Sequence, residues 1–196
     1  MTDEAAPGPR ERILAAAVRC AARSGVQRFS LEDVAAEAAL SRATIYRQFP
    51  GGRDQLVQEA ATWEVARFWA RVAVGIEAEA TLEDRLTVGI VTGAELIRRS
   101  PIMANLGEDE VAELATALRP SEPLVHEVIR SYLRGLLERE ERTGRLRPGT
   151  DLSEAADYLT RMVLSVLSAP VGRDLTDEAA VRELVRTQFV GGIVTG

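Results

Sequence analysis

The sequence predicts an all-helical protein. Apolar residues recur at three- and four-residue intervals through most of the 196 residues, and no stretch alternates apolar and polar residues with a β-branched bias. The segments that break the helical period are short and rich in Gly or Pro. Hydrophobic residues make up 46% of the chain, which is enough to form a real core, and the pattern fits about nine helices.

Three short helices are predicted in the first 50 residues. Residues 10–24 form an amphipathic helix that ends at Gly25, a good left-handed stop. Ser30 and Asp33 have the spacing of a capping box, so a second helix begins at that point. Ser41 is the N-cap of a third helix with the sequence RATIYRQF. The second and third helices therefore meet at a tight turn.

Longer helices are predicted after the Pro-Gly-Gly break at residues 50–52. An amphipathic segment runs from Asp54 to about residue 79. Further helices begin at the capping and proline signals that follow, which are Thr81, Pro101, residues 121–123, Asp151 and Thr176.

Composition excludes several classes of protein. The chain has one cysteine, Cys20, and one histidine, His126, so it can form no internal disulfide and has no Cys/His cluster for a structural metal. We expect no cofactor and no metal. The same scarcity leaves most histidine-dependent hydrolytic chemistry without a starting point, which disfavours an enzyme.

Charge and hydropathy point to a folded protein without a membrane span. The apolar runs are far shorter than the roughly 20 residues that cross a bilayer, so we expect no membrane contact and a cytoplasmic location. The net charge is −6, which argues against a generally basic protein that coats nucleic acid. Residues 1–60 hold eight Arg and eight Asp or Glu, so the acidity lies in the remainder of the chain.

The helix that follows Ser41 has a polar outward face. At 100° per residue, Ile45 and Phe49 point together toward a core, which places Ala43 and Arg47 directly opposite. Arg42 and Tyr46 flank this face on one side, and Thr44 and Gln48 flank it on the other. Ala35, Ala39 and Ile45 also have the spacing of the crossing residue, the turn residue and the anchor of a helix-turn-helix.

These side chains suit duplex DNA. A guanidinium can grip a guanine edge with two hydrogen bonds, small residues allow close approach to the groove, and hydroxyl or amide groups bind phosphates. Free N–H groups at the two helix starts add anion-docking positions. The expected DNA-binding residues are Ser30, Ser41, Arg42, Ala43, Thr44, Tyr46, Arg47, Gln48 and Arg53.

The segment from Arg12 to Leu56 resembles the tetracycline-repressor (TetR) family. The resemblance rests on ILAAA, on G-V-x-x-F-S-L-E-D-V-A-A-E-A and on L-S-R-A-T-I-Y-R-Q-F-P. It implies that the helix from Arg42 to Gln48 enters the major groove of operator DNA, and that Tyr46 and Gln48 touch phosphates. The remaining residues match the family only in helix number and order.

Three positions depart from the family pattern. Ala39 stands where the family usually has glycine, so the turn carries strain of about 1 kcal/mol or adopts another geometry. Gln48 replaces a common histidine but can still donate to phosphate. Residues 51–53 (GGR) replace a more usual serine or asparagine followed by lysine, which leaves Arg53 as the expected clamp on the DNA backbone.

The resemblance divides the chain into a disordered tail at residues 1–9, a DNA-binding domain at 10–53 and a sensing and dimerisation domain at 54–196. In the last of these we expect a cavity for a hydrophobic or aromatic effector, lined by apolar or amphipathic residues of the central helices, namely Trp63, Phe68, Ile90, Met103, His126, Ile129, Leu133, Tyr158 and Met162. The last two helices have wide apolar stripes and are expected to pair with a second copy through Leu159, Val163, Val166, Leu167, Val181, Leu184, Val185, Gln188 and Phe189. Alternatively, these stripes cap the core of a single chain.

The sequence therefore predicts a homodimeric regulator, a repressor that a small effector releases from a palindromic operator. A helical protein-interaction module with a degenerate helix-turn-helix is one alternative, and a helical enzyme is another. The carboxylates of residues 108–110 have no partner base and are better explained as a solvated surface.

Overall fold

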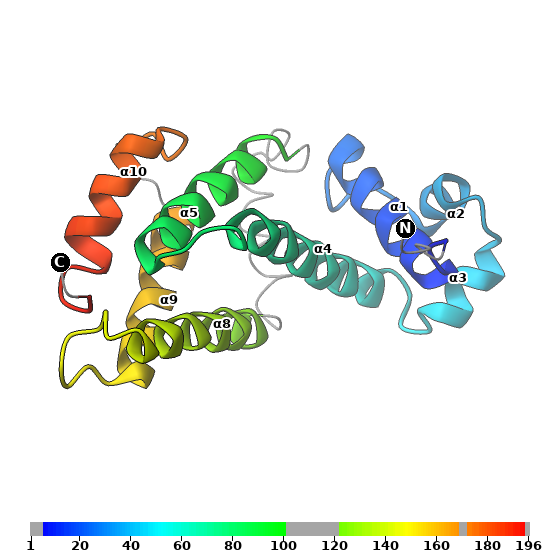
Figure 1. Cartoon of the computed structure of the whole chain (residues 1–196). Helices are drawn as coiled ribbons and strands as arrows, with labels where there is room; N and C mark the ends of the chain where they lie inside the picture. Colours follow the sequence, from blue (N-terminus) through cyan, green and yellow to red (C-terminus); the bar gives the residue numbers. More distant parts are fainter. Residues whose placement is uncertain (1–5, 101–121, 169–171, 195–196) are drawn as a thin grey trace. The chain divides into compact units, whose positions relative to one another are not determined.

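The structure is a computed structural model that describes residues 6–100, 122–168 and 172–194. In these ranges it contains eight α-helices and one isolated antiparallel bridge, between Leu146 and Val194 (Figure 1). The predicted all-helical fold is confirmed. The helix expected after Pro101, and with it Met103, lies outside the described residues.

Contacts divide the chain into two compact units. Among the described residues, the first comprises 6–67 and 99–100, and the second comprises 68–98, 122–168 and 172–194. We call residues 6–67 the head and the described part of the second unit the body. The division falls inside α4 (Gly52–Ile76), because Leu56 and Ala60 of that helix are buried in the core of the head.

The head contains α1 (Pro9–Ser24), α2 (Leu31–Ala38) and α3 (Arg42–Gln48), followed by the start of α4. The expected helix caps are present. The Ser30 N–H donates to Asp33 Oδ2 at 2.8 Å and the Asp33 N–H donates to Ser30 Oγ at 3.1 Å, which completes a capping box. At the start of α3 the Ser41 Oγ accepts from the Thr44 N–H at 3.1 Å.

Two arginines of α1 bind carbonyls at the ends of the other head helices. Arg12 Nη2 donates to the Ala38 oxygen at 2.7 Å, and Arg10 Nη1 donates to the Gln48 oxygen at 2.9 Å. The last carbonyls of a helix have no partner within it and lie at its negative end, so a cation is favourable there. The Arg10 guanidinium also lies 4.6 Å from the centroid of the Phe49 ring and forms an ion pair with Glu59. These contacts fix α2 and α3 against α1.

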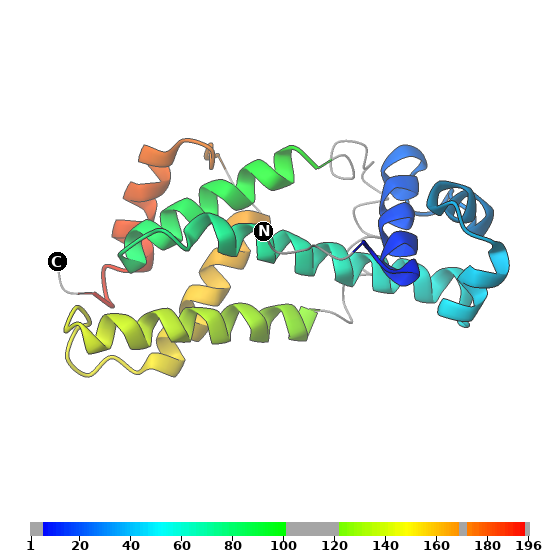
Figure 2. The same ribbon diagram turned by 45° about the vertical axis from the view of Figure 1, so that its right-hand side comes forward.

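The body is built from α5 (Leu82–Arg98), α8 (Glu122–Arg142), α9 (Leu152–Ser168) and α10 (Glu178–Leu184), which continues into a π-helical turn at Val185–Phe189. Helix α8 packs on α9, and α5 packs on α9 and α10 (Figure 2). The second part of α4 completes this unit.

An ion pair with a buried carboxylate fixes the end of α8. Glu140 is only 3% exposed, and its carboxylate accepts from Arg145 Nε at 2.6 Å and from Nη2 at 3.2 Å. The backbone N–H of Arg145 also donates to the backbone carbonyl of Glu140 at 3.0 Å. Gly144, which precedes Arg145, has a φ of 70°, a conformation that favours glycine. This loop therefore closes α8 directly after Arg142.

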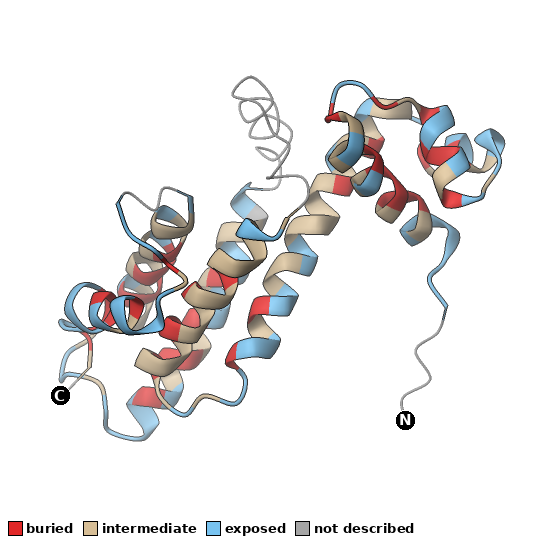
Figure 3. Ribbon diagram, turned by 90° about the horizontal axis from the view of Figure 1, so that it is seen from above, coloured by how far each residue is buried: buried red, intermediate tan, exposed pale blue. Residues whose placement is uncertain are grey.

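The apolar stripes on α9 and α10 are covered within the single chain. Buried and exposed positions alternate along these helices with the helical period (Figure 3). Six of the nine residues expected at a dimer interface belong to the core of the body, namely Leu159, Val163, Val181, Leu184, Val185 and Phe189. Val166 and Leu167 are half-buried, and Gln188 is exposed. The interface expectation is not met by the six buried residues, because they have almost no accessible surface to offer a second copy.

Candidate nucleic-acid interface

Helix α3 presents the polar face that the helical wheel predicts. Ile45 and Phe49 are 0% exposed and belong to the core of the head. Ala43 and Arg47 on the opposite side are exposed, and Tyr46 beside them is 47% exposed although it is aromatic. The helix is therefore anchored by one side and free to enter a groove with the other.

The turn between α2 and α3 is left-handed at Ala39. This residue has φ 51° and ψ 48°, and it is the single non-glycine residue with positive φ in the described ranges. Its N–H donates to the Ala36 oxygen at 3.1 Å, and the Leu40 N–H donates to the Ala35 oxygen at 3.0 Å. The turn thus keeps the geometry that glycine usually adopts, at the steric cost of a Cβ.

We expect Ala39→Gly to stabilise the head by about 0.5–1 kcal/mol. Glycine removes a left-handed strain of about 1–2 kcal/mol, and part of this gain is offset by the greater entropy of glycine in the unfolded chain. Thermal or urea unfolding monitored by circular dichroism measures the change. Ala36→Gly is the matched control, because Ala36 is exposed within α2 and the same substitution there should cost about 1 kcal/mol. A lower melting temperature for Ala39→Gly would show that the turn carries no strain.

The two arginines of α3 differ in their surroundings. Arg47 is exposed and makes no hydrogen bond or ion pair with the part of the chain that the structure describes. Arg42, in contrast, places Nη2 2.5 Å from the Glu32 Oε1 of α2. Arg47 is therefore ready to bind an external acceptor, whereas Arg42 already has one.

The two capping serines also differ. The Ser30 N–H and hydroxyl both donate to Asp33 Oδ2, at 2.8 and 2.7 Å, and the backbone hydrogen bond holds the pKa of the Asp33 carboxyl below its ordinary value. Ser30 thus has no donor left for a phosphate. Ser41 Oγ lies 2.9 Å from Thr44 Oγ1, and because two hydroxyls share one hydrogen bond, the other hydroxyl hydrogen remains available.

Arg53 points into the head. Its Nε donates to the Phe29 oxygen at 3.2 Å, Nη2 donates to the Val26 oxygen, and the guanidinium lies 5.0 Å from the centroid of the Phe29 ring. The arginine therefore ties the start of α4 to the loop between α1 and α2. This differs from the DNA clamp that the sequence suggested, because the loop carbonyls reach the guanidinium first.

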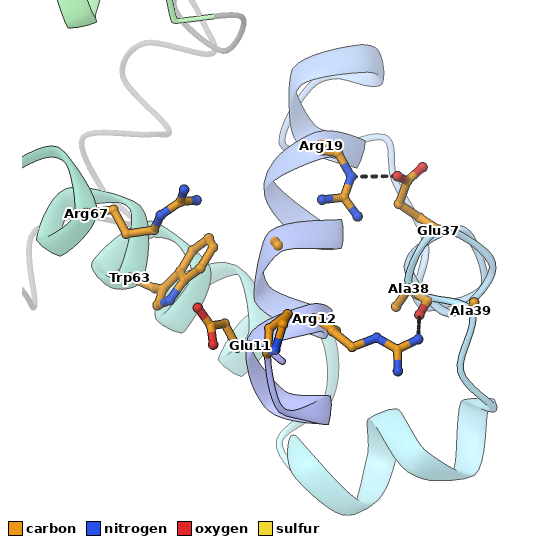
Figure 4. Close-up of a pocket in the computed structure, with 10 residues that line it drawn as sticks. Glu11, Arg12, Arg19, Glu37, Ala38, Ala39, Trp63 and Arg67 are labelled. Atoms are coloured by element: carbon orange, nitrogen blue, oxygen red, sulfur yellow. Dashed lines mark hydrogen bonds and ion pairs between the residues drawn. The ribbon is translucent and has the colours of Figure 1, made fainter. Parts of the chain in front are cut away.

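Trp63 belongs to the head. It packs on the core of this unit, the Arg67 guanidinium lies 4.5 Å from the centroid of its ring, and both residues lie on the opposite side of α1 from Arg19 and Glu37 (Figure 4). An open groove along α1 has a volume of about 510 Å³. It is lined by Pro7, Glu11, Arg12, Ala15, Arg19, Glu37, Ala38, Ala39, Trp63 and Arg67. Trp63 therefore falls in a different unit from the other expected cavity residues that the structure describes.

The remaining expected cavity residues that the structure describes belong to the body. Ile90, Ile129 and Leu133 are buried in its core, whereas Phe68, His126, Tyr158 and Met162 are half-buried. The Tyr158 hydroxyl donates to the backbone carbonyl of Gln188.

Gly93 is buried in α5 at a close helix contact that was not predicted from the sequence. A Cβ there would lie 3.2 Å from the Leu167 methyl groups and 3.5 Å from Phe68 Cζ. An isolated glycine inside a helical pattern was the available signal for this close approach.

Two kinds of feature are absent from the described residues. None of the described helices has the length and apolar character of a bilayer-spanning segment. No group of three or more His, Cys, Asp or Glu side chains in the described ranges is arranged to hold a metal ion.

A small three-helix head, in which a left-handed turn holds α3 with its polar side outward, is a helix-turn-helix DNA-binding domain. Residues 13–60 match the family model described as bacterial regulatory proteins of the tetR family. An uncharacterised HTH-type transcriptional regulator of Mycobacterium tuberculosis is 28% identical over 185 residues, which are 94% of this chain and 85% of that protein. Together these findings support a TetR-family transcriptional regulator whose DNA-binding domain lies in residues 13–60.

Solved structures of this family share the fold. The TetR-family repressor AlkX of Dietzia sp., implicated in biodegradation of n-alkanes, superposes with a TM-score of 0.66 at 24% identity, over 96% of this chain and 98% of AlkX. SmeT, the repressor of a multidrug efflux pump of Stenotrophomonas maltophilia, was solved in complex with triclosan. That complex has a TM-score of 0.64 at 20% identity, over 95% of this chain and 92% of SmeT.

Proposed function

We propose that this protein is a transcriptional repressor that reads a palindromic operator with α3 and leaves it when a small hydrophobic or aromatic effector binds the body. The observation that carries the proposal is the outward face of α3, where Arg47 is exposed and has no partner in the described part of the chain. Arg47 is the group that reads a base edge, and Tyr46, Gln48 and the Ser41–Thr44 hydroxyl pair bind phosphates.

The repressor acts as a homodimer. One α3 of seven residues covers only a few base pairs, so two heads about 34–36 Å apart are needed to read the two halves of a palindrome. The exposed and half-buried residues of α9, α10 and the π-helical turn form the pairing surface, among them Val166, Leu167 and Gln188. The mass in solution at micromolar concentration tests this, because a monomer would remove the basis for half-site spacing.

The effector binds the body, and the fold relatives support its chemical class. SmeT was solved with triclosan, and AlkX is implicated in biodegradation of n-alkanes, so both relatives are associated with apolar or aromatic compounds. The body of this chain offers apolar and aromatic side chains, with Phe68, Tyr158 and Met162 half-buried beside an apolar core. A 100-fold loss of operator affinity requires the effector to prefer the released state by about 2.7 kcal/mol.

Selection of bound sequences from a random duplex library tests the function. We expect a palindromic winner whose affinity falls steeply with salt, since each neutralised phosphate contributes a slope of about 0.9 in a plot of log affinity against log salt. A protein-interaction module or an enzyme with this fold would enrich no sequence and show no such slope. If the full chain ignores duplexes of every sequence at low ionic strength, the proposal is wrong.

A further inference from the structure

Nearly all the arginines of the head are already engaged. Residues 6–60 contain eight, and seven of them bind an acceptor. Arg10, Arg12, Arg28 and Arg53 bind carbonyls, Arg19 and Arg23 bind Glu37, and Arg42 binds Glu32. Arg47 alone of the eight has no partner in the described part of the chain. This is a sparse supply of free cations for a protein whose ligand is a polyanion.

The Arg42–Glu32 ion pair is the arginine interaction that DNA can break most easily. The two side chains are 59% and 51% exposed, so water and ions reach both. The other six engaged arginines lie outside α3. Arg42 is the first residue of α3 and Glu32 the second of α2. The ion pair therefore connects the starts of the two helices of the helix-turn-helix, residues 31–48, which we call the reader.

We propose that Glu32 sets the DNA affinity of the reader by competing with DNA phosphate for Arg42. In the free protein the Glu32 carboxylate holds the guanidinium, and on DNA a phosphate takes its place. The inference rests on the proposed DNA-binding function and adds a residue that opposes binding within the reader itself.

The physical basis is an exchange of one anion for another. Arg42 gains little when it leaves a carboxylate for a single phosphate, since both bonds are charge-assisted and solvated. The released Glu32 carboxylate then lies close to the DNA backbone and is repelled by it. Duplexes of non-operator sequence are therefore bound with lower affinity than the arginine content of the head suggests.

Removal of the Glu32 charge should strengthen DNA binding. We expect Glu32→Gln in the full chain to tighten binding to a random-sequence duplex by about two- to fivefold per head, the value of an exposed ion pair. The dependence on salt should become steeper by up to about 0.9 per head, because Arg42 then adds a net phosphate contact. Titration of the labelled duplex at several salt concentrations, followed by fluorescence anisotropy, gives both quantities.

A double-mutant cycle separates competition for Arg42 from simple repulsion. In an Arg42→Gln background the gain from Glu32→Gln should shrink to the effect of Asp54→Asn. Asp54 is the matched control because it is an exposed acid of the same head that makes no ion pair with the described part of the chain. Circular dichroism checks that each variant remains folded.

Each outcome decides the proposal. A gain of equal size in the Arg42→Gln background would show that Glu32 merely repels DNA. A loss of affinity in Glu32→Gln would show that the carboxylate positions Arg42 for binding, and an unchanged affinity would show that the ion pair does not matter. These three outcomes overturn the inference while the wild-type chain still binds DNA. If the wild type and all variants ignore duplex DNA at low salt, the proposed function fails with it.

Discussion

Replacement of Arg47 by alanine is expected to cost about 1–3 kcal/mol of operator binding per head and to relax the preference at one position of each half-site. A two-pronged arginine–guanine contact has about this value, and its loss affects one base pair. Arg47 lies opposite the buried Ile45–Phe49 side of α3 and has no competing partner in the described residues, so DNA would gain its full set of donors. Binding of the selected operator and of its single-base variants measures both effects.

Arg23→Ala is the matched control for the lost charge. Arg23 lies on α1, and its partner Glu37 retains the ion pair with Arg19 at 2.6 Å. This variant should change operator affinity little and leave the base preferences unaltered. If Arg47→Ala weakens all sequences equally, Arg47 contacts phosphate, and the base-reading role assigned to it is wrong.

Phe49→Ala should destabilise the head by about 3–5 kcal/mol, the usual cost of removing a fully buried phenyl ring. Phe49 is 0% exposed and closes α3 with an N–H bond to the Ile45 oxygen at 2.8 Å. Arg10 would also lose the ring that lies under its guanidinium, a contact of about 0.5–1 kcal/mol. Urea unfolding measures the loss, and operator binding should weaken because α3 is no longer fixed to α1.

Tyr46→Ala is the control for this substitution, since it removes an aromatic ring from the same helix at a 47% exposed position. We expect its stability to change by less than about 1 kcal/mol, as for surface positions in general, while DNA binding weakens. Equal destabilisation by the two substitutions would contradict the assignment of an inner and an outer side to α3.

Local interactions explain why much of the reader could be predicted. The capping box at Ser30 and the N-cap at Ser41 act within three residues, and the helical period places Ile45 and Phe49 on one side of α3 whatever lies around them. At Ala39 the sequence left two options open, a strained left-handed turn or another geometry, and the structure has the left-handed turn.

The sequence by itself determined the helices of the head, their caps and the outward face of α3, because those features depend on residues within one or two turns of each other. Tertiary structure alone decided that Arg53 binds the carbonyls of Val26 and Phe29, that Glu32 takes Arg42, and that the stripes of α9 and α10 are covered by the body. Periodicity shows that a face is buried or that a cation is present. Which surface covers that face, and which oxygen reaches that cation first, depends on segments far apart in the chain that only folding brings together.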